Sequence, residues 1–306
     1  MSIGDGSVIY LVFILSVMLN GATDAANAIT GAVCGGAMSY RRAAILSALL
    51  NFLGLTVFSF FSPSLYESVG KLSTGDVREG AAVLLTVVIF AGGAWFFSIP
   101  TSESHAMIAA MAGAGAAFGK SIDKDMLIYI TVGAVAGALL GALLSGACVK
   151  LLPLKILSGK WLVTAGCAVS SFVHGAQDGQ KFLALAVATG IMNESAFSVL
   201  AVATLMLLGT LLGGKRIVIK LGERMTPVDT KSAVASDMGS AASLLFLTLL
   251  GIPASTTHTK TCAIAGAAAA SGKKVDIKEL LSIVLGWLIT LPVCFLLAYF
   301  ITKTIN

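Results

Sequence analysis

The sequence predicts an all-α polytopic membrane protein made of two inverted repeats. Composition, an internal repeat and the charges of the connecting segments carry this prediction. Hydrophobic residues make up 57% of the 306 residues and charged residues only 11%, whereas soluble domains carry roughly 25% charged residues. The net charge of +5 is spread over short clusters between apolar runs, a pattern typical of topology signals and not of a nucleic-acid-binding surface.

Long apolar runs predict the membrane-spanning helices, because a span needs about 20 predominantly apolar residues. We expect three crossings in each half of the chain: residues 8–19, 43–61 and 127–149, then 161–192, 196–212 and 280–301. Between the second and third crossings of each half, residues 81–118 and 239–271 are each expected to form a re-entrant hairpin. Lipid cannot hydrogen-bond to backbone groups, so the non-helical peptide at the tip of a hairpin inside the lipid bilayer must face protein or a water-filled cavity.

Two polar motifs recur in the same order half a chain apart. Residues 99–105 resemble residues 252–258, with Pro100 matching Pro253 at an offset of 153, and residues 21–24 resemble residues 175–178 at an offset of 154. This indicates a duplication. We therefore predict a first repeat over residues 1–152 and a second over 153–306, which together form one functional unit.

Loop charges predict that the repeats are inverted. Arg41 and Arg42 mark an inside loop, while the equivalent segment 193–195 has no cation. Conversely, residues 62–80 carry few cations, while the equivalent segment 213–238 carries many. We expect each repeat to contain a broken first helix, a hairpin and further crossings, as in many secondary transporters, with both termini extracellular.

The tips of the two hairpins present hydroxyl groups just after a proline. They lie in residues 99–105, the first tip, and residues 252–258, the second tip; the hydroxyl residues are Ser102, Ser104, Ser255, Thr256 and Thr257. The N-terminus of a helix that returns from such a tip favours an anion. Ordinary helix capping is the alternative, but the symmetric placement favours an anion-binding site, with Gln180 as a further candidate.

Asp24 and Asp178 form a second symmetric pair, and an ionised carboxylate inside a bilayer is costly. Thr23 and Asn27 beside Asp24 make an oxygen-rich set suited to a small cation. We therefore predict a coupling-ion site, for Na⁺ or H⁺, that also includes Gln177; Na⁺ ligands could come from Asp24, Asn27 and Asp178. Lys181 stands where the first repeat has Asn27 and can neutralise Asp178. An internal ion pair without a role in transport is the alternative.

Glu103 stands where the second tip has Thr256. It could carry a proton, bind the coupling cation, or accept a proton from the substrate, and the last role would favour hydrogen phosphate over sulfate. The histidines at 105, 174 and 258 are interpreted as capping or packing residues, because no spacing indicates a metal site.

These motifs resemble those of the inorganic phosphate transporter (PiT) family, whose motifs run roughly GANDVANA, HGxNDxxK and PxSTTH. Here residues 21–28 are GATDAANA, residues 174–181 are HGAQDGQK and residues 253–258 are PASTTH. The resemblance implies an alternating-access symporter of the plasma (inner) membrane, commonly a homodimer, with no cofactor besides the coupling ion. Thr23, Gln177 and Glu103 depart from the family pattern at positions among the candidate ligands, so they bear on the choice of substrate and coupling ion. Phosphate is the first expectation for the substrate and sulfate the second.

An anion channel and an intramembrane enzyme are the two alternatives to a symporter. An anion channel would also suit two half-helices that meet in the membrane, but a passive pore has little need of buried carboxylates. An intramembrane enzyme is disfavoured because the sequence has no GxSxG or HExxH motif. We therefore expect a transporter and no enzymatic activity.

Overall fold

The computed structural model describes residues 6–97, 99–120, 124–153 and 159–305. These residues are almost entirely helical, with two short π-helical segments and no strand among them. The first repeat contains α1 (Gly6–Cys34), α2 (Tyr40–Phe61), α3 (Ser64–Gly70), α4 (Val77–Phe97), α5 (Glu103–Ala117) and α6 (Lys124–Leu151). The second contains α8 (Lys160–His174), η1 (Gly175–Gly179), α9 (Gln180–Ala188), α10 (Ala196–Leu212), α11 (Lys215–Ile219), η2 (Lys220–Arg224), α12 (Thr230–Leu249), α13 (Thr256–Ala270) and α14 (Ile277–Ile305).

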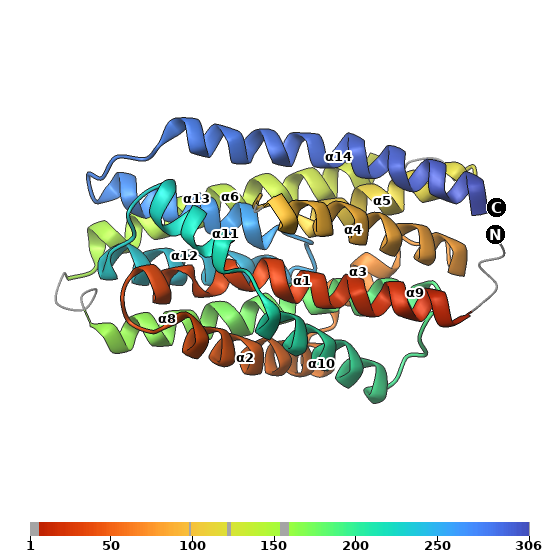
Figure 1. The fold of residues 1–306 in the computed structure, drawn as a ribbon, viewed down its shortest axis with the longest axis horizontal. Helices are drawn as coiled ribbons and strands as arrows, with labels where there is room; N and C mark the ends of the chain where they lie inside the picture. Colours follow the sequence, from red (N-terminus) through yellow and green to blue (C-terminus); the bar gives the residue numbers. More distant parts are fainter. Residues whose placement is uncertain (1–5, 98, 121–123, 154–158, 306) are drawn as a thin grey trace.

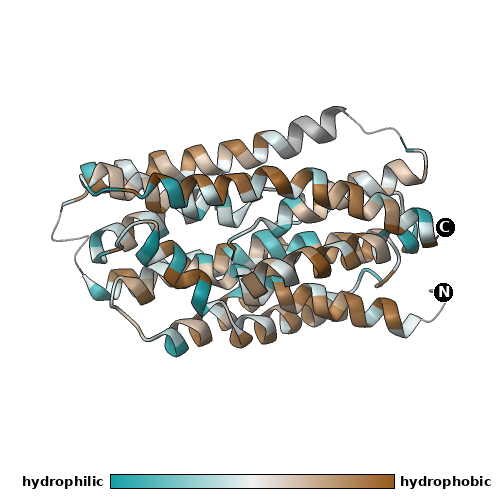
Figure 2. Cartoon of the chain, turned by 45° about the horizontal axis from the view of Figure 1, so that its top comes forward, coloured by the Kyte–Doolittle hydropathy of each residue, from teal (hydrophilic) through white to brown (hydrophobic). Residues whose placement is uncertain are grey.

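The helices have the lengths and surfaces of a membrane protein. Six of the described helices are long and apolar enough to cross a membrane, and α10 with the bent segment α11–η2 could supply a seventh span. Large apolar side chains such as Leu143, Leu288 and Phe300 are exposed on the outside of the bundle. Figure 2 shows hydrophobic segments along the outer helices, with hydrophilic residues at the ends and in the interior. The prediction of a multi-pass membrane protein is confirmed.

The two repeats follow inverted paths, as predicted from the loop charges. In Figure 1, α1 starts at the end of the bundle that holds both termini, and α6 finishes at the opposite end. The second repeat starts with α8 at that opposite end and returns with α14 to the end that holds the termini. An odd number of crossings in each half produces this arrangement.

Each hairpin enters and leaves at one end of the bundle. The helices α4 and α5 enter from the end that holds the termini, and α12 and α13 from the other end, so that the two tips meet at mid-length (Figure 1). The returning helices α5 and α13 have 15 residues each, about 22 Å of helix, which is too short to cross a hydrocarbon layer of about 30 Å. The second hairpin begins at Thr230, ahead of the expected residue 239, because the Asp229 side chain accepts a hydrogen bond from Ser232 N and starts α12 there.

The expected break in the first helix is wrong for the first repeat, whereas in the second repeat the π-helical segment η1 interrupts the α-helix between α8 and α9. The polar residues of α1 continue the helix through Cys34, and the equivalent segment of the second repeat stays helical through the π-helical turn η1. Glycines in these two segments allow close packing of neighbouring helices. A Cβ atom on Gly21 would lie 2.4 Å from the Met206 carbonyl oxygen of α10, and one on Gly175 would lie 2.1 Å from that of Asn51 on α2.

Candidate functional site

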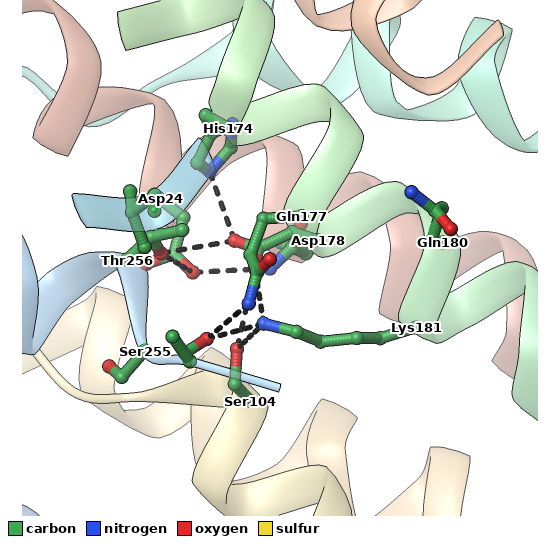
Figure 3. A network of polar contacts seen from close by, with 12 residues as sticks. Asp24, Ser104, His174, Gln177, Asp178, Gln180, Lys181, Ser255 and Thr256 are labelled. Carbon is green, nitrogen blue, oxygen red and sulfur yellow. Dashed lines mark hydrogen bonds and ion pairs between the residues drawn. The ribbon is translucent and has the colours of Figure 1, made fainter. Parts of the chain in front are cut away.

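Both hairpin tips reach the two buried aspartates at the middle of the bundle. Asp24 comes from α1 and Asp178 from η1, and their exposed fractions are 3% and 1%. Figure 3 shows the two side chains close together, with Thr256 between them and Ser104 approaching from the first tip. The site therefore draws on four segments, two from each repeat.

The second tip holds Asp24, which belongs to the first repeat. Thr257 Oγ1 lies 3.0 Å from Asp24 Oδ1 and Thr256 Oγ1 lies 3.4 Å from Asp24 Oδ2, each as the donor. The amides of Asn27 and Asn20 also donate to Asp24, over 3.1 Å and 3.2 Å. Among the described residues, only neutral amide and hydroxyl groups hydrogen-bond to this carboxylate.

The first tip reaches Asp178, which belongs to the second repeat. Ser104 Oγ donates to Asp178 Oδ1 over 3.3 Å. Thr256 of the second tip lies between the two aspartates, with its Oγ1 also 3.1 Å from Asp178 Oδ2. Ser104 and Thr257 occupy equivalent positions at the offset of 153. Each tip thus donates a hydroxyl hydrogen bond to the aspartate of the other repeat.

Lys181 compensates the charge of Asp178. Its ammonium nitrogen lies 2.8 Å from Asp178 Oδ1, 2.6 Å from Ser104 Oγ and 2.6 Å from the Ala254 carbonyl oxygen. These three acceptors use all three donors of an ammonium group. The arrangement joins both tips to η1 and contains the ion pair that the sequence predicted.

Glu103 lies beside α1 rather than between the aspartates. Thr23 Oγ1 is within hydrogen-bonding distance of Glu103 Oε1. Glu103 Oε2 is buried and has no hydrogen-bond partner among the described residues. The three roles considered for Glu103, as a proton carrier, a cation ligand or an acceptor of a substrate proton, stay predictions.

Three of the predicted site residues, Ser102, Ser255 and Gln177, hydrogen-bond to the backbone of the tips. Ser102 and Ser255 cap α5 and α13 by accepting hydrogen bonds from the backbone N–H groups of His105 and His258, so the capping alternative applies to them. The Gln177 amide donates to the carbonyl oxygens of Ile252 and Ala254 and thereby fastens the second tip.

Gln180 is not brought into the site. Its amide nitrogen donates to the Ala176 carbonyl oxygen, and its amide oxygen accepts from Tyr66 N. Figure 3 shows this side chain on the far side of the helix from the tips. The structure therefore gives no contact that supports Gln180 as a substrate ligand.

His174 is the main residue of the site that was not predicted from the sequence. Its Nε2 lies 3.1 Å from Asp178 Oδ2, and its Nδ1 lies 3.0 Å from Asn51 Oδ1. The Asn51 amide in turn donates to Thr210 Oγ1. Two features of the sequence could have predicted this series of contacts. They are the i, i+4 spacing of His174 and Asp178, and an asparagine within the apolar run 43–61.

His105 and His258 lie behind the tips and pack as expected. Their rings stack with centroids 4.5 Å apart, and the His258 ring lies 3.8 Å from the Trp287 ring. The ligand atoms of Asp24, His174 and Asp178 lie within 4.8 Å of one another, a spacing that can hold a small cation. The tip hydroxyls of Ser104 and Thr256 and the ammonium group of Lys181 on α9 lie around the same carboxylate, Asp178, and are groups that can bind an anion.

Comparison with known proteins identifies the family. A model described as "Phosphate transporter family" matches residues 20–160 and again residues 154–298. The chain belongs to the phosphate transporter family. The two successive matches of one family model also support the internal duplication.

Members of the phosphate transporter family match nearly the whole chain. A probable low-affinity inorganic phosphate transporter of Rhizobium meliloti is 32% identical over 92% of this chain and 90% of its own length. Another of Bacillus subtilis is 29% identical and covers 94% of both chains. A solved structure titled "The sodium-dependent phosphate transporter" matches 98% of both chains with a TM-score of 0.86 at 18% identity, and this likeness supports the fold.

Proposed function

We propose that this chain is a secondary active symporter that moves inorganic phosphate by alternating access, driven by a Na⁺ or H⁺ gradient. The observation that carries the proposal is the crosswise contact at the site: each hairpin tip hydrogen-bonds to the aspartate of the opposite repeat. A shift of one repeat against the other would rearrange anion and cation ligands together. Such mechanical linkage is what coupled transport requires. The names of its relatives support phosphate as the cargo.

The anion would bind between the starts of α5 and α13. Ser104, Thr256 and Thr257 supply hydroxyl donors there, and Lys181 supplies a positive charge. Hydroxyl groups bind an oxyanion without holding it as firmly as several fixed cations would. Glu103 favours phosphate over the alternative substrate, sulfate, because a hydrogen phosphate has a proton to donate to its unpartnered oxygen and sulfate has none.

Asp24 is the strongest candidate for the coupling-ion ligand. A buried carboxylate without an opposite charge is costly, and Asp24 is hydrogen-bonded by neutral groups while Lys181 compensates Asp178. Binding of Na⁺ or H⁺ at Asp24 would remove this cost. Asn27 and Thr23 flank Asp24, and Asp178 and His174 complete a cation-sized cluster.

The orientation in the membrane follows from the loop charges. Arg41 and Arg42 lie in the first turn of α2, at the end of the bundle opposite the termini, and the positive-inside rule favours a cytoplasmic location for that end. We propose a plasma (inner) membrane protein with both termini outside. The homodimer implied by the family resemblance stays a prediction.

Uptake of radiolabelled phosphate into proteoliposomes tests the function. A Na⁺ gradient and a pH gradient are imposed separately, and sulfate is tested in parallel. We expect saturable phosphate uptake that one of the two gradients drives, and its identity assigns the coupling ion. Saturable sulfate uptake without phosphate uptake would show that sulfate, and not phosphate, is the substrate. Flux that does not depend on either gradient would contradict symport.

A further inference from the structure

A second buried ion pair lies outside the site, between the two helices of the second hairpin. The Lys260 ammonium of α13 contacts Asp237 Oδ1 of α12, and the two residues are 2% and 0% exposed. Asp237 Oδ2 is buried and has no hydrogen-bond partner among the described residues. Charged groups at membrane depth are expensive and are most often functional.

The fold has a dedicated space for the Asp237 carboxylate. A Cβ atom on Gly31 of α1 would lie 2.7 Å from Asp237 Oδ2, and one on Gly166 of α8 would lie 2.9 Å from Asp237 Cβ. Any larger residue at these two positions would displace the carboxylate. Three helices from both repeats therefore shape this pocket.

The first repeat builds the equivalent place from apolar residues. At the offset of 153, Asp237 corresponds to Leu84 and Lys260 to Met107, and at the offset of 154 Gly31 corresponds to Leu185. Leu84, Met107 and Leu185 all belong to one hydrophobic core cluster. A hairpin of this fold thus packs well without the ion pair, so packing alone does not account for it.

Lys260 also borders the site. It follows Thr256 by one helical turn on the same face of α13, and it lines a small cavity together with Asn27, His174 and Thr256. The cavity has a volume of about 10 Å³, close to the space that one water molecule needs. From the tip, Lys260 lies in the direction in which α13 runs, toward the end of the bundle opposite the termini (Figure 1).

We propose that Lys260 is a second anion-binding station, on the route between the midplane site and the end opposite the termini, and that Asp237 is the counter-ion that competes for it. This inference rests on the proposed function. When the hairpins shift, the ammonium exchanges Asp237 for the phosphate that leaves Thr256. Asp237 then recovers the ammonium, so the anion is released rather than trapped. At the equivalent position of the first hairpin stands Met107, which has no charge to offer an anion.

The test replaces the ion pair by the pair that the first repeat uses, Asp237→Leu with Lys260→Met. This double variant leaves no unpaired charge and is expected to fold, which removes the usual objection to breaking a buried pair. Phosphate transport is measured in right-side-out and inside-out membrane vesicles. The matched control exchanges the first-repeat residues, Leu84→Met with Met107→Leu, a volume-conserving change that should leave transport unchanged.

For the double variant we expect KM for phosphate to rise about tenfold or more on the side opposite the termini, as for a lost charged hydrogen bond. KM on the side of the termini should stay as in the unmodified protein. Wild-type kinetics on both sides would overturn the inference and leave a merely structural pair. An equal rise on both sides would also overturn it, because Lys260 would then belong to the midplane site.

Asp237→Asn provides a second, opposite prediction. It removes the competitor and leaves the ammonium available, so KM on the side opposite the termini should fall while the maximal rate also falls. A rise in KM would contradict the proposed competition. If the unmodified protein transports neither phosphate nor sulfate, the proposed function fails together with the inference. If the unmodified protein transports phosphate and the variants have the same kinetics as it has, the inference alone fails.

Discussion

The two repeats have the same helical path but treat charge in different ways. In the first repeat, the carboxylates of Asp24 and Glu103 are hydrogen-bonded by neutral groups. In the second, Asp178 and Asp237 are each paired with a lysine. The difference indicates a division of labour: the first repeat has carboxylates that can take up a cation, and the second has ammonium groups that can attract an anion. The crosswise contacts of the tips connect the two functions.

Removal of the lysine that compensates Asp178 in the second repeat should have the largest effect on stability and uptake. Lys181→Met leaves the buried Asp178 carboxylate without its lysine, with only His174 and hydroxyl groups beside it, which we expect to cost about 3–5 kcal/mol of stability and to abolish uptake. Thermal unfolding in detergent and phosphate uptake measure the two effects. Asp178→Asn combined with Lys181→Met removes both charges, so it should recover stability but not uptake. A stable, active Lys181→Met variant would contradict the role assigned to this pair.

Removal of the crosswise hydroxyls should weaken phosphate binding strongly. Ser104→Ala with Thr257→Val deletes one hydroxyl from each tip and keeps the side-chain size similar. Hydrogen bonds to charged groups contribute about 1.5–3 kcal/mol each, so we expect KM for phosphate to rise at least tenfold. Kinetics of radiolabelled phosphate uptake measure this change. An unchanged KM would place the anion elsewhere.

Replacement of Glu103 by the residue of the second tip should change preference more than rate. Glu103→Thr removes the unpartnered carboxylate oxygen beside Thr23 and leaves a hydroxyl. We expect a lower phosphate-to-sulfate ratio in uptake, because the acceptor for the substrate proton is lost. Competition between the two labelled anions measures the ratio, and an unchanged ratio together with an unchanged pH profile would make Glu103 a bystander.

The smallest effects are expected for variants that remove a helix N-cap, and these variants test whether Ser255 only caps α13 or also takes part in transport. Ser255→Ala removes an N-cap and should cost about 1 kcal/mol of stability. Its matched control is Ser195→Ala, which removes the cap of α10 far from the tips. We expect the two variants to lose similar stability, and only Ser255→Ala to alter uptake. An equal effect of both variants on uptake would show that the tip cap has no special role.

Much of the fold and part of the site could be predicted from the sequence. Charged residues are so rare in this chain that each polar motif stands out, and the fixed offsets between motifs predicted the duplication. The inverted loop charges require an odd number of crossings in each half, and this requirement predicted both hairpins. The pairing of Lys181 with Asp178 could be predicted from their spacing alone, whereas the contacts of the tips with the aspartates appear only in the structure. Those predictions needed no knowledge of side-chain directions.

The remaining features depend on tertiary packing. Spacing could not distinguish Ser255, which caps a helix, from Thr257, which faces Asp24, because their roles depend on where α13 begins. Gln180 lies on the far side of its helix, and the glycines of α1 allow close helix packing where a break was expected. The pocket around Asp237 requires Gly31 and Gly166 from two distant helices, and no local pattern joins them.

The most direct test of the division of labour is Asp24→Asn, compared in two modes of phosphate transport. Gradient-driven accumulation requires the coupling cation, whereas exchange of external for internal phosphate at equal concentrations requires only that the loaded site can reorient. We predict that Asp24→Asn loses accumulation and keeps exchange. Accumulation at the wild-type level would contradict the assignment of the coupling ion to Asp24, and loss of exchange along with accumulation would mean that Asp24 is needed for the anion itself.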